Sequence, residues 1–206
     1  MRAHASTGMT RIGGGGWRAR SRKTWGALGG LLFLMAGSAW ASVSGPARAE
    51  HLYAALQRTP WIAVGHGPKI VYEVFDPNCP YCHALFEELK PWVARGQLTI
   101  RAVPVGYLTP TSGEKAAAIL MAKDPRKMLL RGEAHYSRHH GMEIPLAIPS
   151  GAARRQLRHN LDLVADGTGS KTVPVLVYKT PNGQARFVIG QPGPRMIKAL
   201  MASIRR

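Results

Sequence analysis

The chain of 206 residues contains two cysteines, and both lie in one C-x-x-C segment, Cys79-Pro80-Tyr81-Cys82. Without further cysteines, the chain has neither a framework of structural disulfides nor the ligands of a four-cysteine zinc site. A single pair of thiols can instead form and break one disulfide. The pattern therefore predicts thiol–disulfide exchange, with no metal and no cofactor.

The residues around the pair place Cys79 at the start of a helix. The apolar, β-branched run 69–75 predicts a buried strand, and a helical pattern begins at Pro80. Unpaired N–H groups and the positive end of the helix dipole favour a thiolate at Cys79, which should lower its pKa. Pro80 suits a first helical turn, where a missing N–H group costs little. Cys82 lies one turn further in, where it can close the disulfide.

Glu73 is a carboxylic acid in the middle of the apolar strand, before Cys79. The alternation of the strand predicts that its side chain points inward, where desolvation would raise its pKa. Such a group could accept the proton of Cys82 through a water molecule and return it. The alternative is a solvated glutamate at the edge of the sheet.

A second unusual feature is Thr172-Val173-Pro174, at the start of another apolar run. Proline is out of place in a central strand unless it takes the first position or a special geometry. A cis Val173–Pro174 bond would leave the backbone of Val173 free to pair with an extended substrate peptide beside Cys79. An ordinary trans proline at a strand start is the alternative.

The predicted elements follow an order that defines a fold class. A strand, a helix and a parallel strand form a βαβ unit, three helices follow, and a hairpin with a last helix ends the chain. The ranges are 69–75, 80–95, 98–105, 112–122, 124–139, 149–165, 173–178, 185–189 and 194–204. This is the order of an α/β, thioredoxin-like fold with a helical subdomain inserted at about 111–165.

Residues 1–41 have the order of a secretory signal peptide: a basic stretch, an apolar run and the pattern Ala39-Trp40-Ala41. The apolar run is shorter than the ~20 residues of a spanning helix. We expect cleavage near Ala41, or else an uncleaved inner-membrane anchor, and a periplasmic location in both cases. Residues 42–59 should form a linker with a short helix over 50–57, and residues 60–206 the folded domain.

The formal net charge of the chain is +17. Six of the positive charges lie in the leader, and the remaining arginines and lysines are scattered along the chain. Aromatic residues do not alternate with them, as they would in a platform for stacking bases. We therefore expect the charge to act on solubility and steering, without a nucleic-acid partner.

The segment Phe75–His83, with Thr172-Val173-Pro174 and Gly190-Gln191-Pro192, resembles the catalytic domain of the DsbC/DsbG group of periplasmic thiol:disulfide interchange proteins. The resemblance covers residues 60–204. It implies that Cys79 attacks, that Cys82 resolves the mixed disulfide, and that Pro174 is cis. Glu73 matches instead the buried acid of DsbA and thioredoxin.

The same resemblance implies partners. These are exported proteins with thiols or disulfides, and a membrane redox partner that recycles the pair. Substrate contacts are expected from Tyr81, Thr172, Val173 and Pro174. DsbC and DsbG also carry an N-terminal dimerisation domain, and the segment before residue 60 is too short for one. We therefore expect a monomer, and isomerase activity is not implied.

Three alternatives remain open. Cys79-x-x-Cys82-His83 also matches the attachment signature of c-type haem, although such a motif needs no preceding strand. A chaperone, or an assembly factor of a secretion or conjugation system, could keep the fold and hold clients in its cleft. His135 and His139 could bind a metal from one helical face, but a wet polar face is expected. His83 itself is expected near the surface, where its charge would stabilise the Cys79 thiolate.

Overall fold

The computed structural model describes residues 45–206. Six helices and seven strands form in this part of the chain. They are α1 (Gly45–Arg58), β1 (Ile62–Gly65), β2 (Lys69–Phe75), α2 (Pro80–Ala94), β3 (Leu98–Pro104), α3 (Ser112–Met121), α4 (Pro125–Ala134), β4 (Tyr136–Ser137), β5 (Gly141–Met142), α5 (Gly151–Thr168), β6 (Val175–Lys179), β7 (Ala185–Ile189) and α6 (Pro194–Ser203). The predicted leader 1–41 lies outside the described residues.

The main sheet has five strands in the order β1-β3-β2-β6-β7. β2 pairs with β3 in parallel and with β6 antiparallel, and β6 and β7 form an antiparallel hairpin. The predicted βαβ unit and the predicted hairpin are therefore confirmed. The register places Glu73 of β2 between Ala102 of β3 and Leu176 of β6, at the centre of the sheet.

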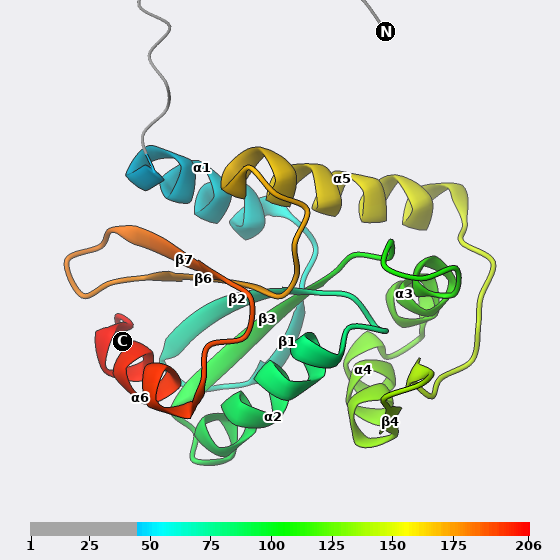
Figure 1. Ribbon diagram of the computed structural model, residues 1–206, viewed down its shortest axis with the longest axis horizontal. Coiled ribbons are helices and arrows are strands. Elements are labelled where there is room, and N and C mark those ends of the chain that lie inside the picture. Colours follow the sequence, from blue (N-terminus) through cyan, green and yellow to red (C-terminus); the bar gives the residue numbers. More distant parts are fainter. Residues whose placement is uncertain (1–44) are drawn as a thin grey trace, which may run out of the picture. The chain divides into compact units, whose positions relative to one another are not determined.

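Helices cover both faces of the sheet. Figure 1 shows α1 and α5 on one face and α2 and α6 on the other. The buried side chains of α2, Cys82, Leu85, Phe86 and Leu89, are those that face the sheet. α2 therefore begins at the end of β2, with its first turn directly above the strand that carries Glu73.

The segment between β3 and α5 forms a small unit beside the first turn of α2. α3 and α4 pack on one another, and β4 and β5 form a short two-stranded sheet. The prediction of a helix through residue 139 is wrong, because α4 ends at Ala134 with His135 as its C-cap. The expected helical face of His135 and His139 therefore does not form.

Two further elements differ from prediction. α1 begins at Gly45, five residues before the predicted start, and Ala49, Leu52 and Leu56 are its buried stripe. β1 was not predicted, because four residues with two buried side chains give too short an alternation. It extends the sheet by pairing antiparallel with β3.

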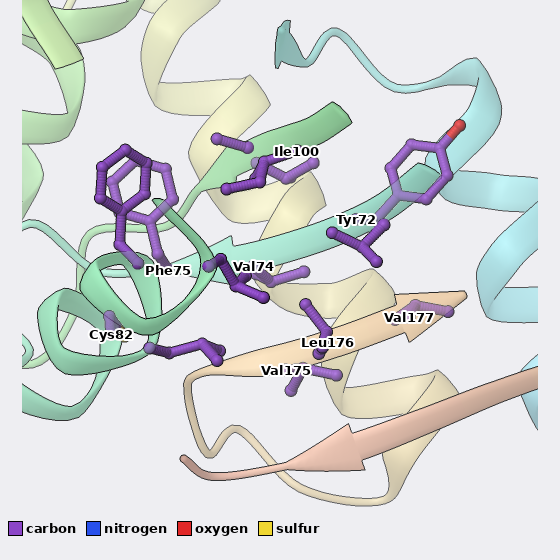
Figure 2. Close-up of a cluster of buried hydrophobic side chains, with 14 of the residues drawn as sticks. Tyr72, Val74, Phe75, Cys82, Ile100, Val175, Leu176 and Val177 are labelled. Atoms are coloured by element: carbon purple, nitrogen blue, oxygen red, sulfur yellow. The ribbon is translucent and has the colours of Figure 1, made fainter. Parts of the chain in front are cut away.

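The core lies between the sheet and the helices. Figure 2 shows Cys82 at one end of a hydrophobic cluster that continues along β2 and β6 through Val74, Val175 and Leu176. The site is thus built on the most completely buried strands of the fold. Within residues 45–206, none of the helices has the length and apolar character that crossing a membrane requires.

Candidate redox site

Cys79 is the N-cap of α2. Its backbone is extended (φ −82°, ψ 114°), and the N–H group of Cys82 donates to its Sγ over 3.3 Å. Pro80 takes the first helical position, as predicted. The thiol of Cys82 and the N–H groups of Cys82 and Tyr81 lower the pKa of Cys79, against the opposing effects of burial and of Asp76. The helix start therefore stabilises the Cys79 thiolate.

Cys82 lies one turn further along the helix and is 1% exposed. Burial raises its pKa well above the ordinary value, and the neighbouring Cys79 adds to the shift. Both cysteines are free thiols in this structure. The pair is therefore asymmetric: the first thiol to lose a proton is Cys79, and the last proton stays on Cys82.

Glu73 is buried beneath the pair, at 2% exposure, as the strand pattern predicted. Neither of its carboxyl oxygens has a hydrogen-bond partner among the described residues. Burial raises its pKa well above the ordinary value, and the charges of Glu133 and Cys79 add to this. Burial therefore favours the protonated form of the side chain, and its oxygens are available to a proton donor or acceptor.

The segment Thr172-Val173-Pro174 lies directly against Cys79. The Val173–Pro174 peptide bond is cis. The carbonyl oxygen of Val173 lies 3.8 Å from Cys79 Sγ and accepts a hydrogen bond from its thiol. When Cys79 loses its proton, this bond is lost and the carbonyl becomes available to another donor.

Two other residues of the predicted substrate contact are at the surface. Tyr81 is 63% exposed, which is high for a large aromatic side chain. Thr172 is also exposed, and its hydroxyl lies 2.6 Å from that of Ser170. Val173 therefore contacts Cys79 directly, Tyr81 is exposed two residues after Cys79, and the Thr172 side chain pairs locally.

His83 has a different partner from the one predicted. Its Nδ1 lies 2.7 Å from Oε2 of Glu133, and its ring stacks on Tyr136 at 4.2 Å between centroids. Glu133 is almost completely buried, which raises its pKa against the opposing effect of His83. His83 thus connects α2 to α4 through a carboxylate that the sequence did not single out, since Glu133 sits in a segment of mixed charge.

Asp76 is a second residue that was not predicted as part of the site. Its carboxylate is 1% exposed and accepts four hydrogen bonds at 2.7–3.1 Å, from the backbone N–H groups of Asn78, Tyr107 and Leu108 and from the hydroxyl of Ser112. Its carbonyl also accepts from the N–H group of Cys79 over 3.0 Å. The loop that delivers Cys79 to the helix start is therefore held at Asp76.

Asn78 anchors the same loop from its other side. Its amide nitrogen donates to three hydroxyls, and its Oδ1 accepts from Nζ of the buried Lys115 over 2.8 Å. The hydroxyls belong to Thr109, Thr111 and Ser112. Gly141 approaches so closely that a Cβ atom there would overlap the Asn78 side chain. The small unit of α3, α4, β4 and β5 therefore positions the residue before Cys79.

Within residues 45–206, no group of three or more His, Cys, Asp or Glu side chains is arranged to hold a metal ion. The haem alternative finds no support in the surroundings of His83, because its ring is already held between Glu133 and Tyr136.

The order of the elements, the cysteine pair at a helix start and the adjacent cis proline define a thioredoxin-like fold with a dithiol site. A periplasmic thioredoxin-like protein from Salmonella enterica serovar Typhimurium has the same fold, with a TM-score of 0.60 and 18% identity. The match covers 73% of this chain and 94% of that one. The predicted α/β, thioredoxin-like fold is confirmed.

The sequence is similar to those of DsbG proteins, so the predicted resemblance to the DsbC/DsbG group is confirmed. The thiol:disulfide interchange protein DsbG of Pseudomonas aeruginosa is 32% identical over 159 residues, and that of Escherichia coli is 28% identical over 158. The matches cover 74% and 75% of this chain, but only 59% and 62% of those proteins. The chain thus spans about three fifths of the length of these relatives. No family model matches it.

Proposed function

We propose that the protein exchanges disulfides with protein substrates through Cys79 and Cys82. The observation that carries the proposal is the asymmetry of the pair: one sulfur is stabilised as an anion at a helix start, and the other is buried and keeps its proton. A nucleophile that is also a good leaving group, beside a shielded resolving thiol, is what two-step exchange requires. The similarity to the DsbG proteins supports the same activity.

The proposed oxidation of a client begins with the closed Cys79–Cys82 disulfide. A client thiolate attacks Sγ of Cys79, the bond to Cys82 breaks, and the departing Cys82 sulfur takes a proton. A second client thiolate then attacks the client sulfur of the mixed disulfide, and Cys79 leaves as a thiolate. The client loses two electrons, which the pair gains, and reduction of a client disulfide follows the reverse path.

Glu73 is proposed to supply and remove the Cys82 proton. It is buried near the pair, burial raises its pKa well above the ordinary value, and neither of its oxygens has a partner in the described residues. A water molecule between Glu73 and Cys82 would complete the path. Replacement of Glu73 by Gln should therefore slow the breaking and closing of the disulfide more than it changes client binding.

Client binding is proposed to use the surfaces on either side of Cys79. The Val173 carbonyl would pair with the backbone of an extended client segment, while Pro174 and Thr172 shape that side. The exposed ring of Tyr81 would contact the client on the other side. Pro80 and the His83–Glu133 pair would act on the reactivity of Cys79 by fixing the first turn of α2.

We further propose that the protein works in the periplasm as a monomer and that a membrane redox partner recycles the pair. The periplasmic thioredoxin-like protein of the same fold supports this location, as does the leader pattern. An exported setting is also where a disulfide persists. Light scattering on the purified protein should give the mass of one chain.

The decisive experiment compares three proteins with a model dithiol client. The native protein should oxidise the client, Cys79→Ser should be inactive, and Cys82→Ala should accumulate a client mixed disulfide that mass spectrometry detects. If the Cys79→Ser/Cys82→Ser variant instead retains the full effect of the protein on clients in the cell, thiol exchange is refuted. Holding of clients without chemistry would then be the function.

A further inference from the structure

Two hollows lie beside the start of α2. The larger, of about 770 Å³, is lined by Asn78, the residue before Cys79, and the smaller, of about 670 Å³, by Pro80 and Tyr81, which follow it. Arg138, in the turn between β4 and β5, lines both. The two hollows therefore share Arg138 as a common lining residue beside the start of α2, and we call them together the Arg138 groove.

The larger hollow is basic. The ionisable side chains that line it include one carboxylate, and they are Lys115, Arg131, Arg138, His139, His140 and Glu143. Within residues 45–206, neither Arg131 nor Arg138 forms an ion pair. Their guanidinium groups are therefore available to the carboxylates of a bound molecule.

Lys115 places a further positive charge at the base of this hollow. It is 6% exposed, and its Nζ donates to Oδ1 of Asn78 and to the carbonyl oxygen of His140. Both acceptors are neutral, and the carboxylates that act on the ammonium group from nearby, Asp76 and Glu143, form no ion pair with it. A fixed, buried cation beneath two exposed guanidinium groups gives this end of the groove a positive potential.

The smaller hollow differs in character. Besides Arg138, it is lined by the exposed ring of Tyr81, the ring of Tyr136, Pro80 and Ala84, with His83 and Gln191 as its other polar residues. This end, next to Cys79, suits an apolar or aromatic side chain. An extended peptide advances by about 3.3 Å per residue, so a few residues would connect the aromatic end to the basic end.

We propose that the Arg138 groove binds the client segment adjoining the reacting cysteine, and that it favours clients with acidic side chains a few residues from that cysteine. The proposal rests on the proposed function, because it names the substrate class of the same site. Positive charge at one end and aromatic surface next to Cys79 are the observations that carry it. Client recognition would then depend on the small unit inserted between β3 and α5.

The test uses three dithiol peptides that differ only at flanking positions, which are all Asp, all Asn or all Lys. Each is oxidised by the purified protein in its disulfide form. For each peptide, the second-order rate constant of this single-turnover oxidation is divided by its rate constant with hydroxyethyl disulfide, an uncharged reagent. That division removes the effect of the flanking charges on the peptide thiols themselves.

We expect the corrected values to fall in the order Asp, Asn, Lys, with a ratio of Asp to Lys of about tenfold at low salt. Because the charges are exposed to water, the ratio should approach one in 0.5 M NaCl. Arg131→Gln/Arg138→Gln should reduce it at least about threefold. The matched control Arg155→Gln/Arg158→Gln, with the same charge change on α5, should leave it unchanged.

Two results would refute the proposal that the Arg138 groove favours acidic clients. One is an Asp to Lys ratio near one in the native protein. The other is an equal loss in both double variants, which would indicate steering by the net charge alone. The activity of the protein toward dithiothreitol distinguishes these two results from failure of the proposed function. If it is oxidised while the peptides show no preference, only the groove is refuted, whereas inactivity toward dithiothreitol and every peptide refutes the exchange activity itself.

Discussion

The burial of Glu73 makes a prediction about folding stability that does not depend on any substrate. The change is Glu73→Gln, which removes the ionisable proton while keeping the shape of the side chain. In the unfolded chain a glutamate ionises with a pKa of about 4.3. In the folded protein burial holds the pKa well above that value, so between the two values the folded state binds one more proton than the unfolded state.

The sign and size of the effect follow from that proton. Stability rises with pH where the unfolded state binds more protons, so here the stability of the native protein falls as the pH rises. The loss is about 1.4 kcal/mol per pH unit, from about pH 5 up to the pKa of the folded protein. Below about pH 4 both states are protonated and the penalty is absent.

The Glu73→Gln variant lacks this dependence. A buried amide without partners costs about 1–3 kcal/mol, but the protonated carboxyl of the native protein also lacks partners, so the two proteins should have similar stability in acid. Its stability relative to the native protein should then rise by about 1.4 kcal/mol for each pH unit, until folded Glu73 ionises.

The measurement is urea unfolding of both proteins at half-unit steps from pH 4 to pH 8. Glu87→Gln is the control for loss of a carboxylate, because the Glu87 side chain is 41% exposed. The pH at which the difference stops growing is the pKa of folded Glu73. If the difference in stability between the Glu73→Gln variant and the native protein is constant over this range, burial does not raise the pKa of the Glu73 carboxyl.

Two further predictions concern the helix start and the loop before it. Cys82→Ala should raise the pKa of Cys79 toward that of an ordinary thiol, because the Cys82 thiol makes the largest contribution to lowering it. The pH profile of alkylation by iodoacetamide measures this pKa, and an unchanged profile would contradict the prediction. Gly141→Ala should destabilise the fold by at least about 2 kcal/mol and slow exchange, since φ is +68° and the new methyl group would overlap Asn78. Gly183→Ala, at φ +80° with nothing nearby, is its control, and equal losses of exchange rate in the two variants would contradict a role for the Asn78 contact.

The parts of the fold that sequence patterns predicted are those in which local signals agree with burial. The apolar run at β2, the helical pattern that begins at Pro80 and the hairpin of β6 and β7 were each predicted, and each forms. The pattern of α4 was misleading because polar residues continue past Ala134 without a glycine or proline to mark the end. β1 was missed because its two buried residues are too few to set a period.

The residues of the site also fall into those that the sequence predicts and those that it does not. Cys79 and Glu73 could be predicted because each contrasts with its surroundings: a thiol at a strand-to-helix junction, and an acid within an apolar strand. Asp76, Lys115 and Glu133 could not, because polar residues at strand ends and on helices are most often solvated. Only the fold shows that their partners, which lie far away in the sequence, bury them.

The buried contacts that the sequence did not predict also determine where Cys79 lies. A C-x-x-C pair acquires its chemistry from where the first cysteine sits relative to the helix start, and a displacement of the N-cap would remove the N–H donor that lies 3.3 Å from Cys79 Sγ. The preceding loop has no regular structure of its own, so its position depends on the hydrogen bonds of Asp76 and Asn78 to residues 107–115. Those residues also lead into the groove with the basic lining. The inserted unit therefore holds the loop that carries the reactive sulfur, and under the proposal above it would also provide the surface that selects clients.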